Sequence, residues 1–317
     1  MNIYDFDETI YDSDSTKDFY FYCLKKYPKI LLSVPIMAWT FFLYILGVKT
    51  KTQFKEKMYR FLTYVPDIDS ALNDFWNVNE HKVKSWYKDR QKDDDIIISA
   101  SPEFLLKPIC ERLGIKNLMA SKVDKHTGLY DGENCWGEEK VKRLYEKFPN
   151  VKCEEFYSDS LSDTPLAELA DKAMIIRNEL IEWNEYKPSK LKMFLSREFL
   201  SFLIVGGINT VSNVIFSTIY SLFIPNTTLA FFPGYITSNV VSYLLNSKLT
   251  FKERLGFVKF IKFFISYIPN FIIQTIIVWL FDNFIHGPSV IAYAIAAIIG
   301  VPVTFVFMKI FTFKKND

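Results

Sequence analysis

Four apolar runs in the later part of the sequence restrict what this chain can fold into more than any other feature. They lie at about 199 to 223, 229 to 247, 260 to 281 and 289 to 308, each close to the roughly 20 residues that a bilayer-spanning helix needs. Half of all residues are hydrophobic, yet most of the charged residues precede the first run. We therefore predict a polar N-terminal part followed by an all-α domain of four transmembrane helices.

Basic residues around these runs indicate how the chain is oriented in the membrane. Lys and Arg precede the first run, fill the loop between the second and third, and follow the fourth, whereas the other two loops contain none. Cytoplasmic loops of membrane proteins carry an excess of basic residues. We therefore expect a multi-pass protein of the cytoplasmic (inner) membrane, with both termini and the polar part in the cytoplasm.

Several function classes are disfavoured by composition. The opening stretch "MNIYDFDETI" has acids at positions 5 and 7, unlike a signal peptide with its basic start and apolar core. A net charge of +2 is too small for a nucleic-acid-binding surface, which needs clustered basic residues. The four cysteines have no C-x-x-C spacing, so we interpret them as reduced thiols and expect no zinc site.

The apolar region contains an internal repeat with an offset of 61 residues. This shift aligns Asn209 with Asn270 and Asn213 with Gln274, and it brings the closing stretches "KLTFK" and "KIFTFKK" together. An amide inside the bilayer must find a polar partner, either in another helix or in a ligand. Asn209, Asn213 and Asn270 are therefore candidate substrate-binding residues. The alternative is that Phe and Lys recur at membrane interfaces by composition alone.

This region, from "FLSFLIVGGINTVSN" through "LLNSKLTF" to "FMKIFTFKK", resembles the GtrA-like family of small four-helix membrane proteins. The resemblance implies a role in moving, or helping to use, polyprenyl-phosphate-linked sugars across the cytoplasmic membrane. It leaves open a homo-oligomer formed through this domain. Phe307 stands in the second half where Asn246 stands in the first, which argues against two equivalent ligand sites.

Chemically active residues follow short apolar strands in the polar part. "YDFDETI" contains the end of a first strand, "DDDIIISASPEF" a second that ends in a hydroxyl, and "EEFYSDSLSDTPLAELA" a third. A lysine lies near the start of the helix predicted in "GEEKVKRLYEKF". Open α/β sheets place their sites at the carboxyl edge of the strands. The residues concerned are Asp5, Asp7, Thr9, Ser99, Lys140, Asp159 and Asp163.

Each of these residues alone has an ordinary structural explanation. Asp-rich turns cap helices, Ser99 can cap the helix after Pro102, and Lys140 on an amphipathic helix is usually a solvated charge. A phosphoryl-transfer site needs a nucleophile, a proton carrier, oxygen ligands for a divalent ion and a cation, and the set offers all four. The order of the residues, three positions directly after strands, favours this chemical interpretation.

The same ordered set resembles the haloacid dehalogenase superfamily of phosphatases, in particular its phosphoserine-phosphatase-like branch. The resemblance implies that Asp5 is the nucleophile that becomes an aspartyl-phosphate. Asp7 would protonate the leaving oxygen and then deprotonate the attacking water. Ser99 and Lys140 would hold the phosphate oxygens, with Thr9 also among the substrate-binding residues.

The cofactor implied by this resemblance is Mg²⁺, which prefers hard oxygen ligands and offsets the repulsion between an anionic nucleophile and a phosphate dianion. Its implied ligands are Asp5, the backbone carbonyl of Asp7, and Asp159, with Asp163 in support. Ala100 stands where phosphoserine-specific members usually carry glycine, which disfavours phosphoserine itself as the substrate.

The two resemblances together predict the domain organisation. An α/β Rossmann-like domain covers residues 1–180 and includes a helical cap at about 12–90 that touches the membrane. A linker follows at 181–198, and the four-helix transmembrane domain occupies 199–317. Trp183, Tyr186 and Phe194 lie among lysines in the linker and are interpreted as interfacial residues.

One segment of the cap, residues 30–48, has no charge over 19 residues. Its length suits a transmembrane helix, but motif residues before and after it must meet in one cytoplasmic site. We interpret it as an interfacial or re-entrant segment that is broken at Pro35. Flanking lysines, Lys51 among them, would then contact anionic headgroups. The alternative is a helix buried in the cap core.

Three functions stay open at this stage. The first is a phosphatase of a lipid-anchored phosphate, such as the terminal phosphate of a polyprenyl-phosphate-linked sugar. The second is a phosphatase that is only tethered to the membrane and acts on a small metabolite or on a phospholipid of the phosphatidylglycerophosphate type. The third is a lipid-sugar transporter with a regulatory head.

Overall fold

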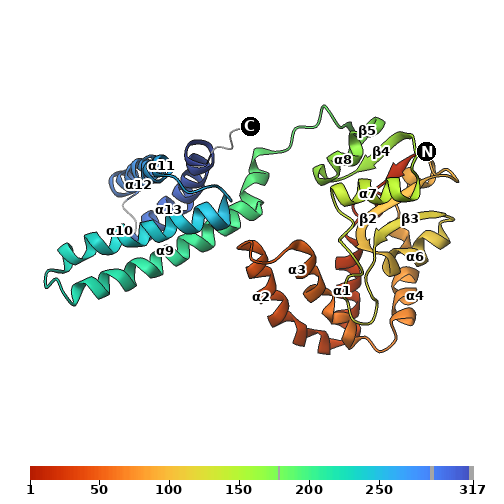
Figure 1. Ribbon diagram of the computed structural model, residues 1–317, viewed down its shortest axis with the longest axis horizontal. Coiled ribbons are helices and arrows are strands. Elements are labelled where there is room, and N and C mark those ends of the chain that lie inside the picture. The colour runs from red at the N-terminus through yellow and green to blue at the C-terminus, as the bar shows by residue number, and fades with distance from the viewer. Residues whose placement is uncertain (178, 286–288, 314–317) are drawn as a thin grey trace. The chain divides into compact units, whose positions relative to one another are not determined.

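The structure, a computed structural model, describes residues 1–177, 179–285 and 289–313. It contains a mixed, mainly parallel sheet with helices in the N-terminal region and an entirely helical C-terminal region (Figure 1). The predicted fold class, an α/β Rossmann-like domain followed by an all-α apolar domain, is therefore confirmed. All four cysteines are free and buried.

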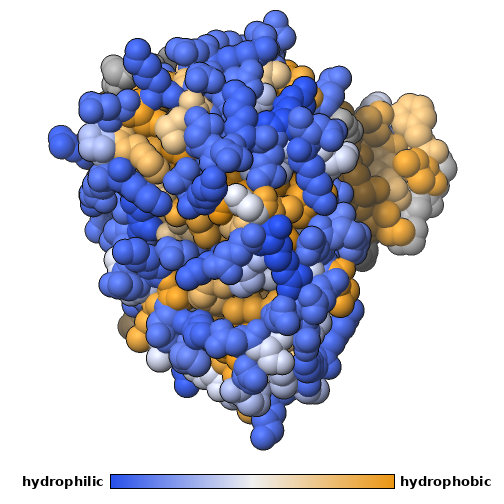
Figure 2. All heavy atoms as spheres, turned by 90° about the vertical axis from the view of Figure 1, so that its right-hand side faces the viewer, coloured by the Kyte–Doolittle hydropathy of each residue, from blue (hydrophilic) through white to orange (hydrophobic). Residues whose placement is uncertain are grey.

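The chain divides into two compact units. The N-terminal unit comprises residues 1–44 and 49–187, and the C-terminal unit comprises 45–48 and 188–317. The face of the N-terminal unit drawn in Figure 2 is covered mainly by hydrophilic residues, with hydrophobic residues in smaller areas between them.

The sheet of the N-terminal unit has six strands in the order β3-β2-β1-β4-β5-β6. The first five strands pair in parallel, and only β6 runs antiparallel to its neighbour β5. Apolar side chains fill both faces of the central strands, as parallel sheets covered by helices require. The strands are β1 (Ile3–Tyr4), β2 (Ile96–Pro102), β3 (Asn117–Ser121), β4 (Cys153–Ser158), β5 (Ala170–Ile176) and β6 (Leu180–Glu182).

The long insertion between β1 and β2 is helical. Side-chain caps start three of its helices: Asp14 accepts from the N–H of Lys17, Asp67 accepts from that of Ser70, and Thr50 forms a reciprocal capping box. The helices are α1 (Ser15–Lys26), α2 (Val34–Ile45), α3 (Lys51–Tyr59), α4 (Ile68–Asn79) and α5 (Ser85–Lys88). The later helices of the unit are α6 (Glu103–Arg112), α7 (Glu138–Lys147) and α8 (Thr164–Ala167).

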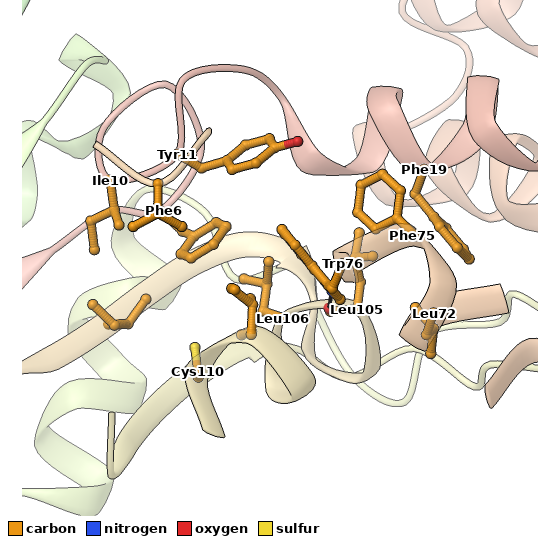
Figure 3. Close-up of a cluster of buried hydrophobic side chains, with 14 of the residues drawn as sticks. Phe6, Ile10, Tyr11, Phe19, Leu72, Phe75, Trp76, Leu105, Leu106 and Cys110 are labelled. Carbon is orange, nitrogen blue, oxygen red and sulfur yellow. Dashed lines mark hydrogen bonds between the residues drawn. The ribbon is translucent and has the colours of Figure 1, made fainter. Parts of the chain in front are cut away.

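An aromatic cluster beneath the first strand fixes the loop that carries the first two acids. Phe6 is fully buried between them, stacks on Tyr11 at 5.9 Å between ring centroids, and meets Trp76 edge-on at 6.1 Å (Figure 3). The indole N–H of Trp76 donates to the carbonyl of Leu105 at 2.8 Å. Because Phe6 is anchored in the core, the acids on either side of it are held in fixed positions at the edge of the sheet.

The uncharged segment at 30–48 forms a 3₁₀ turn at Pro28–Ser33 and then α2. The change of helix type comes just before Pro35, which lies in the first turn of α2. Leu32 and Trp39 are 69% and 60% exposed, so the segment is not a helix enclosed in the cap core. By length and composition Pro28–Ile45 is also a candidate membrane span.

The C-terminal unit contains the apolar helices. Besides Pro28–Ile45, two stretches of the described residues are long and apolar enough to cross a membrane, Arg197–Ser221 and Phe257–Ile277, and Ile298–Thr312 is a shorter apolar helix. The third predicted run is not one regular helix, because α11 ends at Ile265 and α12 begins at Ile268. The helices are α9 (Arg197–Ser221), α10 (Thr227–Leu245), α11 (Phe257–Ile265), α12 (Ile268–Leu280) and α13 (Ser289–Phe307).

The internal repeat is visible in this unit, but its register differs from the predicted offset of 61. Both α10 and α13 continue into π-helical turns, at Asn246–Thr250 and Met308–Thr312. The phenylalanines that follow these turns, Phe251 and Phe313, stack on each other at 4.4 Å between centroids, and they are 62 residues apart. The second half therefore has one residue more than the first before its closing phenylalanine, which explains an offset of 62 there in place of 61.

The predicted linker starts too early. β6 belongs to the sheet and extends it to Glu182, past the predicted limit of residue 180. Trp183 packs on Phe156 at 5.8 Å between ring centroids, and its backbone N–H donates to the carbonyl of Ala173. Tyr186 accepts a hydrogen bond from Arg177. These two aromatic residues are therefore held by the α/β domain and are not free interfacial residues.

Candidate active site

The residues predicted after β1 and β4 and on α7 come together at the carboxyl edge of the sheet. Lys140 Nζ donates to Asp5 Oδ1 at 2.9 Å and to Asp163 Oδ2 at 2.8 Å, and Ser158 Oγ also donates to Asp163 Oδ2 at 2.8 Å. Lys140 is 2% exposed. Gly137, with φ +59°, provides the left-handed turn that leads into α7 and so brings Lys140 to this edge.

The Lys140 ammonium and the Asp5 carboxyl influence each other's pKa in this buried position. Burial raises the pKa of the Asp5 carboxyl, and the Lys140 ammonium limits that rise. Burial alone would lower the pKa of Lys140, but the charges of Asp5 and Asp163 raise it above its ordinary value. The Lys140 ammonium, 2.9 Å from Asp5 Oδ1, thus favours the anionic form of Asp5 that a nucleophile needs.

Asp7 is held by two hydrogen bonds. The backbone N–H of Ser15 donates to Asp7 Oδ1 at 2.7 Å, and Ser101 Oγ donates to Asp7 Oδ2 at 2.5 Å. Thr16 Oγ1 lies 3.0 Å from Ser101 Oγ and fixes that hydroxyl in turn. Burial and the nearby charge of Asp14 raise the pKa of Asp7, a direction that suits a group which must both give and take a proton.

Ser99 and Thr9 lie at the same edge with different surroundings. Ser99 lies inside β2, three residues before the strand ends, where the pairing with β3 shifts register, and it lines the cavity. The prediction that the strand ends at this hydroxyl was therefore wrong, although the hydroxyl still reaches the site. Thr9 is fully buried and its Oγ1 accepts the backbone N–H of Asp159 at 2.9 Å. It ties two motif loops together and is not open to a substrate, contrary to its predicted role.

Asp159 faces the cavity from the loop after β4. Burial and the charge of Glu8 raise its pKa to about 6, and Arg177, whose Nη1 lies 4.0 Å from Asp159 Oδ2, opposes the rise. Among the described residues, no three acidic, histidine or cysteine side chains converge as a ready-made metal cage. The donor set is nevertheless all oxygen, and the buried Asp163 Oδ1 has no hydrogen-bond partner in the part of the chain that the structure describes. Mg²⁺ commonly binds through one or two carboxylates and several waters, so these residues fit it.

A cavity of about 600 Å³ opens over these groups. Its lining includes Asp5, Asp7, Ser99, Lys140 and Asp159, which lie in or after strands or on α7 at the carboxyl edge of the sheet. The rest of its wall comes largely from the inserted helices α1, α2 and α3 and is mainly apolar or aromatic. These wall residues are Tyr20, Phe21, Met37, Tyr44, Phe54, Met58, Tyr59 and Phe61.

Comparison with known proteins decides the family. Residues 3–168, just over half of the chain, match the family described as haloacid dehalogenase-like hydrolase. The chain belongs to the haloacid dehalogenase-like hydrolases. Residues 201–313 match the GtrA/DPMS transmembrane domain, so this hydrolase carries a GtrA-like domain and is a membrane protein.

The curated relatives each match about a quarter of this chain. Protein CicA of Caulobacter vibrioides is 34% identical over 83 residues, which cover 24% of this chain and 37% of that protein. The histidinol-phosphatase of Neisseria meningitidis is 29% identical over 96 residues, covering 26% and 43%. A probable phosphatase of Mycobacterium tuberculosis is 33% identical over 91 residues, covering 26% and 31%. The hydrolase thus matches less than half the length of each of these relatives.

Two solved structures resemble the hydrolase unit. A protein of unknown function from Bordetella pertussis Tohama I has a TM-score of 0.45 and 19% identity, covering 55% of this chain and 87% of that chain. A phosphoserine phosphohydrolase-like protein from Francisella tularensis has a TM-score of 0.36 and 16% identity, covering 55% and 86%.

Three residues of the hydrolase site were not predicted. Ser101 follows Ser99 by two positions on one strand, and this period of two was the signal that both hydroxyls point the same way. Lys51 and Lys55 on α3 also line the cavity. Lys51 was interpreted as a contact for anionic headgroups because it flanks an apolar run, and the structure places it in the lining of the cavity.

The predicted residues of the GtrA-like domain are only partly paired. The Oδ1 atoms of Asn209 and Asn270 are buried without a hydrogen-bond partner among the described residues. Asn213 Oδ1 accepts from Ser217 Oγ at 3.3 Å. The side chain of Gln274 lies outside the described part. The two unpaired amide oxygens occupy the positions that the repeat aligned.

Proposed function

We propose that this hydrolase is a Mg²⁺-dependent phosphatase of a membrane-anchored substrate, a polyprenyl-phosphate-linked sugar phosphate, and that its GtrA-like domain binds or translocates the product. The observation that carries the proposal is the cavity, which joins a phosphoryl-transfer end to a wall of apolar and aromatic cap residues. A phosphatase of small polar metabolites has little use for such a wall, whereas a lipid-linked ester fits both ends.

The chemistry follows from the groups at the polar end. Asp5 attacks the phosphorus of the ester, and the bond from phosphorus to the leaving oxygen breaks as the aspartyl-phosphate forms. Asp7, oriented by Ser101, gives its proton to the leaving oxygen. It then takes a proton from water, which attacks the aspartyl-phosphate and releases inorganic phosphate. Ser99 and Lys140 hold the phosphate oxygens throughout.

Asp5, the carbonyl of Asp7 and Asp159 would hold Mg²⁺, supported by Asp163. When bound, the ion supplies positive charge that lowers the repulsion between the Asp5 carboxylate and the phosphate dianion. The unpaired Asp163 Oδ1 is available to a water of its coordination shell.

The cap explains how a lipid substrate would reach the cavity. Met37 and Tyr44 of α2 line the cavity, while Trp39 on the same helix is exposed and stacks on Phe42 at 5.5 Å between centroids. An exposed aromatic and aliphatic surface suits the membrane interface. The cap would thus dip into the cytoplasmic leaflet of the inner membrane with the catalytic end in the cytoplasm.

The test replaces Trp39 and Phe42 by serine in the full-length protein. We expect hydrolysis of vesicle-bound lipid esters to fall at least about tenfold in kcat/KM, because apolar contact with the bilayer is lost, and hydrolysis of p-nitrophenyl phosphate to change far less. Tyr145→Ser on α7, also an exposed aromatic residue, is the matched control and should spare both activities.

The choice of substrate separates the candidate functions. A polyprenyl-phosphate-linked sugar phosphate and phosphatidylglycerophosphate are offered in the same vesicles, and preference for the second would identify a phospholipid phosphatase. Equal losses on the lipid and on p-nitrophenyl phosphate would refute membrane engagement by α2. Absence of phosphate release from every ester would refute the phosphatase and favour a lipid-sugar transporter with a regulatory head.

A further inference from the structure

Helix α3 presents two lysines to the catalytic cavity. Lys51 and Lys55 are four residues apart, so their side chains leave the same face of the helix, and both line the cavity. Neither belongs to the motifs that make up the phosphoryl-transfer end. They come from the inserted cap, which also supplies the apolar wall.

Neither ammonium has an anionic partner among the described residues. Lys51 Nζ lies 4.3 Å from the ring centroid of Trp136. Lys55 Nζ donates to the carbonyl of Ala100 at 3.0 Å and to Asn134 Oδ1 at 3.1 Å, both neutral acceptors. Burial, and secondarily the charge of Lys51, lower the pKa of Lys55 to about 8. Two unpaired cations close together in a partly dry cavity are unfavourable until an anion joins them.

The carboxylates that face Lys55 are already engaged. Asp7 accepts from Ser15 and Ser101, and Asp14 accepts from the backbone N–H of Lys17 at the start of α1. Neither forms an ion pair with Lys55 in the described part of the chain. The charge of Asp163 acts on Lys51 in the same way, but within the described part of the chain neither lysine forms an ion pair.

We propose that Lys51 and Lys55 form a second anion subsite, which binds a phosphodiester that the substrate carries in addition to the phosphomonoester that is cleaved. The inference rests on the proposed phosphatase function and names its substrate class: a phosphomonoester joined through a short polar unit to a lipid phosphodiester. The order along the cavity is then cleaved phosphate, polar unit, phosphodiester and lipid.

The main rival is that these lysines hold the phosphate that is cleaved. That phosphate already has Lys140, Ser99 and the metal-binding acids around it. Lys51 and Lys55 instead belong to the cap, next to apolar wall residues such as Phe54 and Met58 of the same helix. A substrate that continues from the cleaved phosphate toward this wall passes the two ammonium groups.

The phosphodiester at this subsite can be linked either to a sugar or to glycerol. Four small probes distinguish these two substrates. The first pair is methyl glucoside 6-phosphate and glucose 6-phosphate with a methyl phosphodiester on carbon 1. The second pair is glycerol 3-phosphate and the same compound with a methyl phosphodiester on carbon 1. Within each pair only the second anion differs.

Binding is measured by calorimetry on full-length Asp5→Asn in detergent with Mg²⁺, a background in which no probe is cleaved. We expect the diester-bearing member of one pair to bind about ten- to a hundredfold more tightly than its partner, the gain of one or two charge-assisted contacts. Adding Lys51→Gln or Lys55→Gln should remove most of that preference. Adding Lys57→Gln, an exposed lysine on the same helix, should leave it intact.

Each outcome has one meaning. Preference in the sugar pair or in the glycerol pair supports the subsite and identifies the source. No preference in either pair, or a preference that survives both lysine substitutions, overturns it. Equal weakening of all four probes also overturns it, because the lysines then act on the cleaved phosphate.

Turnover of the same probes by the unsubstituted protein tests the phosphatase function separately. Thermal unfolding of the Lys55→Gln variant checks its fold, and Lys51→Gln removes no hydrogen bond.

Discussion

The buried ammonium of Lys140 should stabilise the hydrolase unit strongly, because it separates two carboxylates that would otherwise be left uncompensated. In Lys140→Met, Asp5 and Asp163 lose donors at 2.9 and 2.8 Å and remain at or near full burial. Removing one partner from a buried ion pair costs about 3–5 kcal/mol of unfolding free energy. For a unit of this size, each kcal/mol of lost unfolding free energy lowers Tm by about 2–4 °C. Tm should therefore fall by about 6–20 °C.

The loss should depend on pH in a definite direction. The folded-state pKa of Asp5 is already raised by burial, and removing Lys140 raises it further. A carboxyl with a raised folded-state pKa destabilises the fold increasingly as pH rises from its unfolded-state pKa toward its folded-state pKa. The difference in Tm between the variant and the unsubstituted protein should therefore be large at pH 8 and much smaller at pH 5.

The assay is thermal unfolding of the full-length protein in detergent, followed by tryptophan fluorescence, with EDTA present so that no divalent ion replaces the lost charge. Lys142→Met on the same helix is the matched control. Its side chain is 65% exposed and its ion pairs to Glu139 and Glu146 are 3.8 and 3.9 Å long, so Tm should change by no more than about 2 °C. A loss for Lys140→Met that matches the control, or one that is the same at both pH values, would refute the reasoning.

Two further predictions concern the two domains. Asp5→Asn should abolish Mg²⁺-dependent phosphate release while preserving the fold, because it removes the nucleophile at nearly constant shape; a phosphate-release assay that finds full activity would rule out an aspartyl-phosphate at this position. Replacing Asn209 and Asn270 by leucine should weaken binding of the dephosphorylated sugar lipid, measured by native mass spectrometry, and leave phosphate release in detergent largely intact. Unchanged lipid binding would mean that the membrane domain only anchors the hydrolase.

The sequence was sufficient for the parts of the site that depend on strand order. Asp5 and Asp159 directly follow β1 and β4, and parallel strands bring their carboxyl ends to one edge whatever the details of packing. Lys140 was found because it occupies the start of a strongly amphipathic helix at the right place in the order. These inferences use only local pattern and topology, which a single sequence carries.

Residues whose direction is set by tertiary packing could not be predicted. Lys51 follows an apolar run and has the sequence signature of a headgroup contact, but the packing of α3 turns it into the cavity. Thr9 looks like any exposed turn residue until the loop after β4 covers it. Trp183 among charged residues looks interfacial, yet the added strand β6 folds it back onto Phe156. In each case a distant segment decides which side of an element is exposed.

The order of events in the proposed reaction follows from the charges that each domain offers. The lining of the catalytic cavity combines four lysines, Lys17, Lys51, Lys55 and Lys140, with six acids, some of which would hold Mg²⁺ in the proposed reaction. The aligned residues of the membrane domain, Asn209 and Asn270, offer neutral amides, which suit the hydroxyls of a sugar and supply no positive charge to a phosphate. A phosphomonoester carries about two negative charges, and moving charge through the bilayer interior is costly. If the GtrA-like domain translocates the lipid as proposed, we expect dephosphorylation to come first, because it removes charge, and we expect this domain to bind the product more tightly than the substrate.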